Sequence, residues 1–270
     1  MTDSAGTLDE ARWCTLLLRA ARGPGVVPMA CWSDGAGLWV AAPADSAAVA
    51  VLRRDPDCQV GVGLEAGTAV VLRVTARIYG LHDPLGLLLH GPVVSAAMAA
   101  LAANHADSVL DYVAEAARVP ARRLPRDPVA IRLAVGEPAP ADDLAVEGGL
   151  APALPSVVPA DVRRVLSGVR CLVLVSECAG PQGHGGLDAG PAVWGAGFAL
   201  SLPPRRRLEA GTSVLATATA EAGGKPAGIA LHGSVEAGCV LRPERVTWWR
   251  GASAETVDLP RATASITLPD

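Results

Sequence analysis

The chain has 270 residues, half of them hydrophobic and 3% aromatic, which is enough for one large domain or two small ones with a buried core. Its formal net charge is −4 and no stripe of Arg or Lys stands out, so nucleic-acid binding is not expected. The first residues lack the basic and apolar regions of a signal peptide, and no segment reaches about 18 uninterrupted apolar residues. We therefore expect a cytoplasmic protein with no membrane span.

The six cysteines form no CxxC pair, and none lies at zinc-finger spacing from a histidine. We expect free thiols, several of them buried in strands, and no metal site. The sequence also lacks a GxSxG elbow, so it identifies no catalytic residue.

The first part of the chain alternates short apolar runs with turn residues. Residues 7–21 are expected to form a helix that ends at the RGPG loop. The elements predicted next are strands at 26–32 and 37–43 joined by the hairpin signal Ser33-Asp34-Gly35, a short helix opened by Asp45 or Ser46, and a strand at 58–63.

Residues 68–79 are predicted to form the longest strand. Their side chains alternate between an apolar face and a polar one. The apolar face comprises Leu72, Val74, Ala76 and Ile78, and the other face comprises Arg73, Thr75, Arg77 and Tyr79. Arg73 and Arg77 either line a ligand cleft or belong to a solvated strand face, where arginine is common.

The middle of the chain changes to helical periodicity over residues 92–119 and returns to a strand at 128–135. A segment rich in Pro, Gly and acidic residues follows, and we interpret 141–160 as a linker. The second half then has a predicted short helix at 161–166 and strands at 171–176, 193–202, 212–220, 228–235 and 239–250.

The two halves repeat one order of elements, and each closes on a strand preceded by proline and followed by glycine, RDPVAIRLAVG and RPERVTWWRG. Repeated order at this length indicates two copies of one module. We therefore predict a mainly β chain with flanking helices, in the α+β class, made of two small barrels that pack face to face as an intrachain pseudo-dimer. The predicted boundaries are 1–140 with the helical insertion 92–119, the linker 141–160, and 161–270.

Three segments resemble one known family. VVPMACWSDGAGLWVAAPADSAAVAVLRRDPDCQVGV resembles the start of the FMN-binding split β-barrel proteins related to pyridoxamine 5′-phosphate oxidase and flavin reductases. TAVVLRVTARIYGLHDP and RPERVTWWRG look like that family's long strand and last strand. The resemblance implies tandem split barrels with FMN, or the deazaflavin F420, at the cleft between them, and an oxidoreductase activity that the cofactor supplies.

The helix that begins after Ser46 departs from the family pattern, in which Lys or Arg commonly follows. Here the positions are Ala47, Ala48 and Ala50. A helix N-terminus alone contributes only about 0.3–1 kcal/mol toward an anion. Ser46 is thus a cofactor-binding candidate at a weakened site.

Arginines elsewhere are the candidates that would replace the missing cation. By element order, PPRRRLEA occupies the place of the first short helix, which puts Arg205, Arg206 and Arg207 at the equivalent helix start. The alternative for these arginines is a solvated turn. Trp248 is a candidate for stacking on an aromatic ligand, and its alternative is the core or the interface between the barrels.

Three functions remain open. The first is an FMN- or F420-dependent oxidoreductase with a small-molecule ligand. The second is a cofactor-free protein with a binding or assembly role, and the third is a heme-binding protein, since some split barrels bind heme. The chain is expected to be a monomer with an internal pseudo-dimer or a homodimer, without nucleic acid or membrane as a partner.

Overall fold

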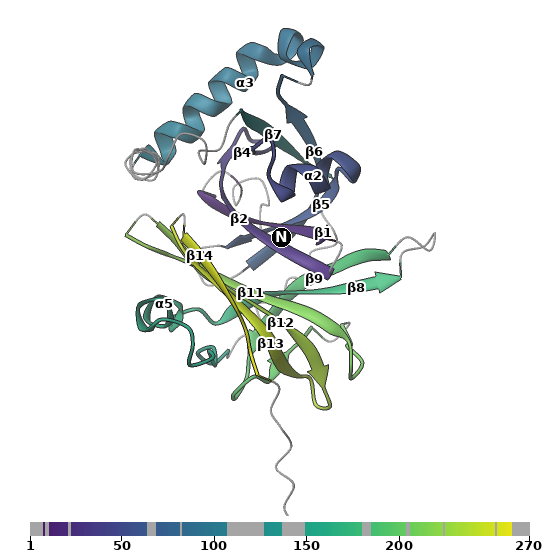
Figure 1. The fold of residues 1–270 in the computed structure, drawn as a ribbon, viewed down its shortest axis with the longest axis vertical. Coiled ribbons are helices and arrows are strands. Elements are labelled where there is room, and N and C mark those ends of the chain that lie inside the picture. The colour runs from purple at the N-terminus through teal and green to yellow at the C-terminus, as the bar shows by residue number, and fades with distance from the viewer. Residues whose placement is uncertain are drawn as a thin grey trace, which may run out of the picture.

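A computed structural model shows the protein as two curled sheets, one stacked on the other (Figure 1). It describes residues 8, 11–20, 23–63, 69–81, 83–106, 127–136, 149–179, 185–203, 206–223, 225–251 and 253–260. Each sheet has seven strands, and every neighbouring pair is antiparallel.

The first sheet has the strand order β2-β1-β5-β6-β7-β4-β3. Its elements along the chain are β1 (Trp13–Ala20), β2 (Gly23–Ala30), β3 (Trp32–Ser33), β4 (Gly37–Pro43), α2 (Ala47–Arg54), β5 (Asp57–Gly63), β6 (Ala69–Tyr79), α3 (Pro84–Asn104) and β7 (Pro128–Val135). The inward side chains of these strands, with Val49 and Leu52 of α2, form one buried apolar cluster.

The second sheet has the strand order β10-β9-β8-β11-β12-β13-β14. Its elements are α5 (Ala160–Leu166), β8 (Cys171–Ala179), β9 (Gly185–Trp194), β10 (Leu200–Ser201), β11 (Ser213–Ala222), β12 (Lys225–Glu236), β13 (Val240–Arg250) and β14 (Ser253–Asp258). Val162 and Leu166 of α5 pack into the buried cluster of this sheet.

The two sheets repeat one topology, because β2-β1-β5-β6-β7 corresponds in order to β9-β8-β11-β12-β13. The predicted mainly β fold with two tandem barrel-like sheets is therefore confirmed. The halves differ at the sheet edges, because β4 and β3 follow β7 whereas β14 follows β13 and β10 flanks β9, and they differ at one connection. β6 reaches β7 through α3, whereas β12 turns directly into β13 at Gly238 and Cys239, both with positive φ.

The two halves pack through a third apolar cluster, which makes the chain a pseudo-dimer. Leu17 from the first sheet lies among Val173, Val175, Leu215 and Trp249 of the second. Polar contacts cross the same seam, where Gln59 Nε2 donates to Leu187 O at 2.8 Å and the hydroxyls of Thr15 and Thr219 lie 3.3 Å apart.

The prediction of a helix at 7–21 was wrong, because residues 13–20 form the strand β1. Leu16 and Leu18 point into the first barrel, while Leu17 points into the cluster between the sheets. A strand that is buried on both faces is apolar at consecutive positions, and such a run has no alternation that separates it from a buried helix.

The helical insertion was predicted to start at Pro92, but α3 begins at Pro84 and contains Pro92. Asp83 caps the helix, since its carboxylate accepts from the Gly86 N–H at 2.9 Å. Pro92 has no backbone N–H, so it cannot make the helical hydrogen bond to the Leu88 carbonyl four residues earlier. Leu88 and Pro92 are both exposed, so water can satisfy that carbonyl. Residues 107–119 of the predicted insertion lie outside the described residues.

The helix start predicted in the second half is also absent. The described residues of that segment, 206–210, form no helix and lead into β11 through a turn. Two consecutive prolines precede the arginines, and proline suits a first helical turn as well as a turn without a helix.

Candidate functional site

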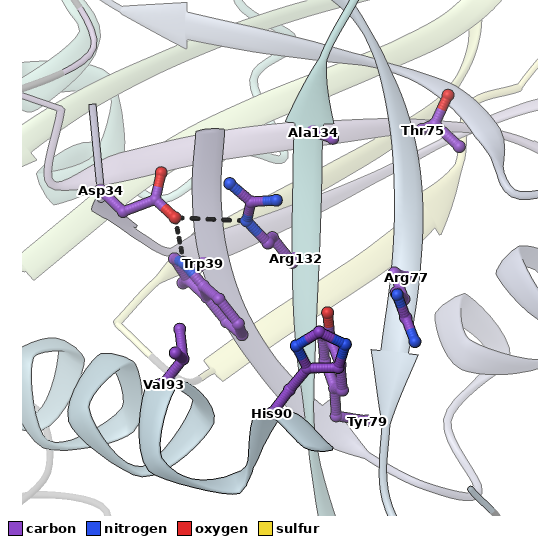
Figure 2. A pocket seen from close by; sticks show the side chains of 9 residues that line it. All are labelled: Asp34, Trp39, Thr75, Arg77, Tyr79, His90, Val93, Arg132 and Ala134. Atoms are coloured by element: carbon purple, nitrogen blue, oxygen red, sulfur yellow. Dashed lines mark hydrogen bonds and ion pairs between the residues drawn. The ribbon is translucent and has the colours of Figure 1, made fainter. Parts of the chain in front are cut away.

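A pocket of about 490 Å³ lies on the outer face of the first sheet, beneath α3 (Figure 2). β4, β6, β7 and α3 supply its walls. The lining residues are Asp34, Trp39, Thr75, Arg77, Tyr79, His90, Val93, Arg132 and Ala134. Ligand pockets typically measure about 300–1,000 Å³, so the space suits a small molecule.

The alternation of β6 accounts for the pocket floor. Leu72, Val74 and Ala76 are buried in the barrel, as predicted, and their neighbours Thr75, Arg77 and Tyr79 face outward into the pocket. The same outward face starts at Val71 in the cluster between the sheets. From Val71 to Tyr79 the strand spans about 26 Å, so one face of β6 connects the seam to the pocket.

Two arginines from neighbouring strands line this pocket. Arg77 of β6 is the direct antiparallel partner of Arg132 of β7. The Arg132 guanidinium lies 5.9 Å from the centre of the Trp39 ring, and that of Arg77 lies 5.2 Å from the Tyr79 ring. Aromatic faces support both cations, and cation–π contacts of this length contribute about 0.5–1 kcal/mol each at exposed sites.

Asp34 fixes one side of the site. Its Oδ2 accepts hydrogen bonds from Trp39 Nε1 at 2.8 Å and from Arg132 Nε at 3.2 Å (Figure 2). Burial alone would raise the pKa of Asp34, but hydrogen bonds from Trp39, the Ala36 amide and Arg132 outweigh it, so the pKa is lowered. Asp34 is thus an anion that orients Arg132 and Trp39.

Aromatic rings form the other wall. Trp39 and Tyr79 are stacked with ring centres 5.7 Å apart and an angle of 25°. His90 projects from α3 and meets the Tyr79 ring edge to face, with ring centres 5.8 Å apart (Figure 2). Trp39 and Tyr79 are almost fully buried, so the two guanidinium groups and the His90 ring are what the pocket presents to a ligand, and they favour one that carries negative charge.

No known family model matches the chain, and no curated protein matches it. Solved structures do. A putative pyridoxamine 5′-phosphate oxidase from Listeria innocua is 12% identical and covers 49% of this chain and 90% of its own, with a TM-score of 0.29. An FAD-binding protein from Mesorhizobium loti is 21% identical over 49% and 86%, with a TM-score of 0.31. The heme storage protein HutZ from Vibrio cholerae is 12% identical over 50% and 89%, with a TM-score of 0.32.

These neighbours are of the kind expected from the sequence, and each of the three covers about half of the chain. At these identities and TM-scores the likeness says nothing about function, which must come from the site itself.

The structure places the first-half candidates in three different settings. Arg77 lies in the pocket. Arg73 lies on the same face of β6, exposed, between the pocket and the seam. The Ser46 hydroxyl caps α2 by accepting from the Val49 N–H at 3.3 Å, and Ala48 beside it is buried.

In the second half, Arg206 is engaged within the protein. Its guanidinium donates to the carbonyls of Leu174, Asp188 and Gly190 at 2.7–3.3 Å and pairs with the Asp188 carboxylate at 3.2 Å. Arg206 thereby joins β8 to β9.

Two further second-half candidates, Arg207 and Trp248, do not line the pocket. Arg207 is exposed, and Arg205 lies outside the described residues. Trp248 is buried in the second barrel, where it packs with apolar neighbours.

Sequence reasoning missed Asp34, Trp39, His90 and Arg132 as site residues. Arg132 carried a signal, because it is the one charged residue in the predicted strand PVAIRLAV. His90 carried none, since it precedes the predicted start of the helix. The sequence predicts a cofactor at a cleft between the barrels, and the centre of that seam is packed with apolar side chains. Among the described residues, no group of three His, Cys, Asp or Glu side chains could hold a metal ion.

Proposed function

We propose that the pocket under α3 binds a planar, negatively charged small molecule, with FMN as the first candidate and F420 as the second. The observation that supports this most directly is the direct pairing of Arg77 with Arg132 beside the stacked Trp39 and Tyr79 rings. This proposal moves the expected cofactor site from the seam to the adjoining face of β6.

The charges of the site favour an anion. Like charges directly opposite each other on neighbouring strands are unfavourable, and a phosphate bridging both guanidinium groups would remove that repulsion. Asp34 is the only acidic residue among the described residues that line the pocket, and its Oδ2 accepts from Arg132 and Trp39. Arg77 contacts the Tyr79 ring and pairs with no described carboxylate, so its donors are available for a ligand.

The residues present fit a flavin. Arg77 and Arg132 would hold the phosphate, and Tyr79, His90 and Val93 would contact the apolar ring system. A bound flavin would supply hydride or electron transfer, and the sequence resemblance makes an oxidoreductase the expected class. The chain would position the cofactor, and α3 would shield one side of it from water.

Titration with FMN and riboflavin, which differ by the phosphate alone, tests this assignment. We expect the wild type to bind FMN at least about tenfold more tightly than riboflavin, and Arg77→Gln to remove that preference. Arg54→Gln, which deletes an exposed arginine on α2, is the matched control and should keep the preference. A wild-type chain that binds neither FMN nor F420 would refute the proposal.

Heme is a second candidate, because His90 is the histidine that projects into the pocket. Neutral imidazole is a common iron ligand. Addition of hemin should then produce a Soret band that is lost in His90→Ala and kept in Arg54→Gln. Absence of both flavin and heme binding would favour the cofactor-free binding or assembly role.

A further inference from the structure

α3 lies at the edge of the molecule, and no described element lies beyond its outer face (Figure 1). That face carries large exposed apolar side chains. Leu85, Leu88 and Leu89 are 71%, 77% and 75% exposed. Their spacing, i, i+3 and i+4, puts them on one side of the helix. Single exposed leucines are ordinary on a protein surface, but a contiguous apolar face marks an interaction site.

The opposite side of α3 is already used. Val94, Ala97 and Leu101 are buried, and the helix contacts β3, β4 and β6. The helix is therefore already packed on the first sheet, and its exposed leucines are not part of that contact. They form a second apolar surface on a helix that is docked through its first one.

The charge pattern of α3 bears on which partner could cover this face. Its 21 residues include no Asp, Glu, Lys or Arg. In a twofold dimer each surface meets an identical copy of itself, so any charge at its centre would face the same charge. An uncharged face is therefore compatible with a second copy of this chain.

A lipid surface fits less well. By length and composition α3 is apolar enough to cross a membrane, with a mean hydropathy of 1.8, but a spanning helix would have to leave β3, β4 and β6. A helix lying on a membrane presents Lys and Arg on its polar face, and α3 has neither.

We infer that two copies of this chain associate through the Leu85–Leu88–Leu89 face of α3. The helix is about 31 Å long, so two such helices packed side by side bury an area at the lower end of specific interfaces. The dimer is accordingly weak and concentration-dependent. This inference does not depend on which ligand the pocket binds.

Sedimentation velocity of the full chain from about 1 to 200 µM tests the inference, since weak dimers dissociate in this range. The wild type should shift from monomer to dimer as concentration rises. Leu88→Glu and Leu88→Lys should each weaken association by about tenfold or more, because each buries like charges against its own copy. An equimolar mixture of the two variants should associate more tightly than either alone.

Leu150→Glu is the matched control, because Leu150 is a half-exposed leucine away from α3 and its variant should dimerise like the wild type. The inference fails if the wild type stays monomeric at every concentration. It also fails if Leu88→Glu and Leu88→Lys dimerise as tightly as the wild type. A monomeric wild type that floats with phosphatidylcholine vesicles would assign the face to lipid instead. Circular dichroism spectra that match the wild type would show that the variants are folded.

Discussion

Arg77 of β6 and Arg132 of β7 are direct partners across two antiparallel strands, and both side chains reach the same pocket. Asp34 offsets the charge of Arg132 alone. The pair therefore leaves a local excess of positive charge on a chain whose overall formal charge is −4. That excess has consequences for stability as well as for binding.

An added polyvalent anion should stabilise the protein through this pair. If pyrophosphate binds the folded state at the two guanidinium groups and not the unfolded chain, at ten times its dissociation constant it should add about 1.4 kcal/mol. Thermal melting with and without pyrophosphate measures the effect. Arg77→Gln should lose most of the increase and Arg54→Gln should keep it, whereas an equal increase in all three proteins would show that the anion acts elsewhere.

Asp34→Asn should destabilise the fold by about 1 kcal/mol, because Arg132 loses its charged acceptor and the Trp39 N–H bonds to a weaker one. The pKa of Asp34 is lowered in the folded protein. Its stabilising contribution is therefore complete above the ordinary aspartate pKa of about 3.9 and is lost as pH falls toward the folded value. Urea unfolding at neutral pH and near pH 3 should show a smaller acid loss in the variant than in the wild type.

His105 should make the fold less stable in mild acid. Its ring is buried, Nε2 lies 3.1 Å from the Cys31 carbonyl, and burial lowers the pKa of His105. The unfolded chain therefore takes up a proton near pH 6.5 that the folded state resists, so stability declines as pH drops below that value.

His105→Gln, which keeps a donor for that carbonyl, should reduce the difference between unfolding free energies at pH 7.5 and 5.5. The pKa of His232 is lowered too, first by burial and then by Arg245, so part of the slope should remain. A variant with the full wild-type slope would contradict the role given to His105.

Leu17→Ala should cost about 2–5 kcal/mol, since this fully buried side chain joins the two sheets. Chemical denaturation gives the value. Leu150→Ala removes the same atoms from a half-exposed position and should cost less than about 1 kcal/mol. Similar losses in both variants would mean that the seam contributes little to holding the halves together.

Arg206→Met should destabilise the second half by about 2–4 kcal/mol, because the carbonyls of β8 and β9 lose a buried charged donor. Arg207→Met, one residue along and exposed, should change stability by less than about 0.5 kcal/mol. If FMN affinity falls in either variant while the fold is intact, the original expectation of a phosphate site at these arginines is supported.

Alternation and turn residues were enough to predict most strands and the repeat, because β6 or β12 shows its two faces in the sequence. β1 was missed because Leu16, Leu17 and Leu18 face two different cores. Of the two arginines that line the pocket, the sequence predicted Arg77 and missed Arg132. Arg77 follows from the alternation of one strand, but its partner Arg132 depends on which strand pairs with β6, and the intervening 48 residues between the strands hide that choice. His90 depends on where α3 begins.

The turn at Gly238 and Cys239 closes the connection that, in the other half, opens into α3. A chain of two equal barrels would offer two equivalent sites, and ligand uptake would saturate at two molecules per polypeptide. Within the described residues the helix-covered face is built once. If the pocket under α3 binds the proposed ligand, the stoichiometry should accordingly be one molecule per polypeptide, with the second barrel serving as a scaffold.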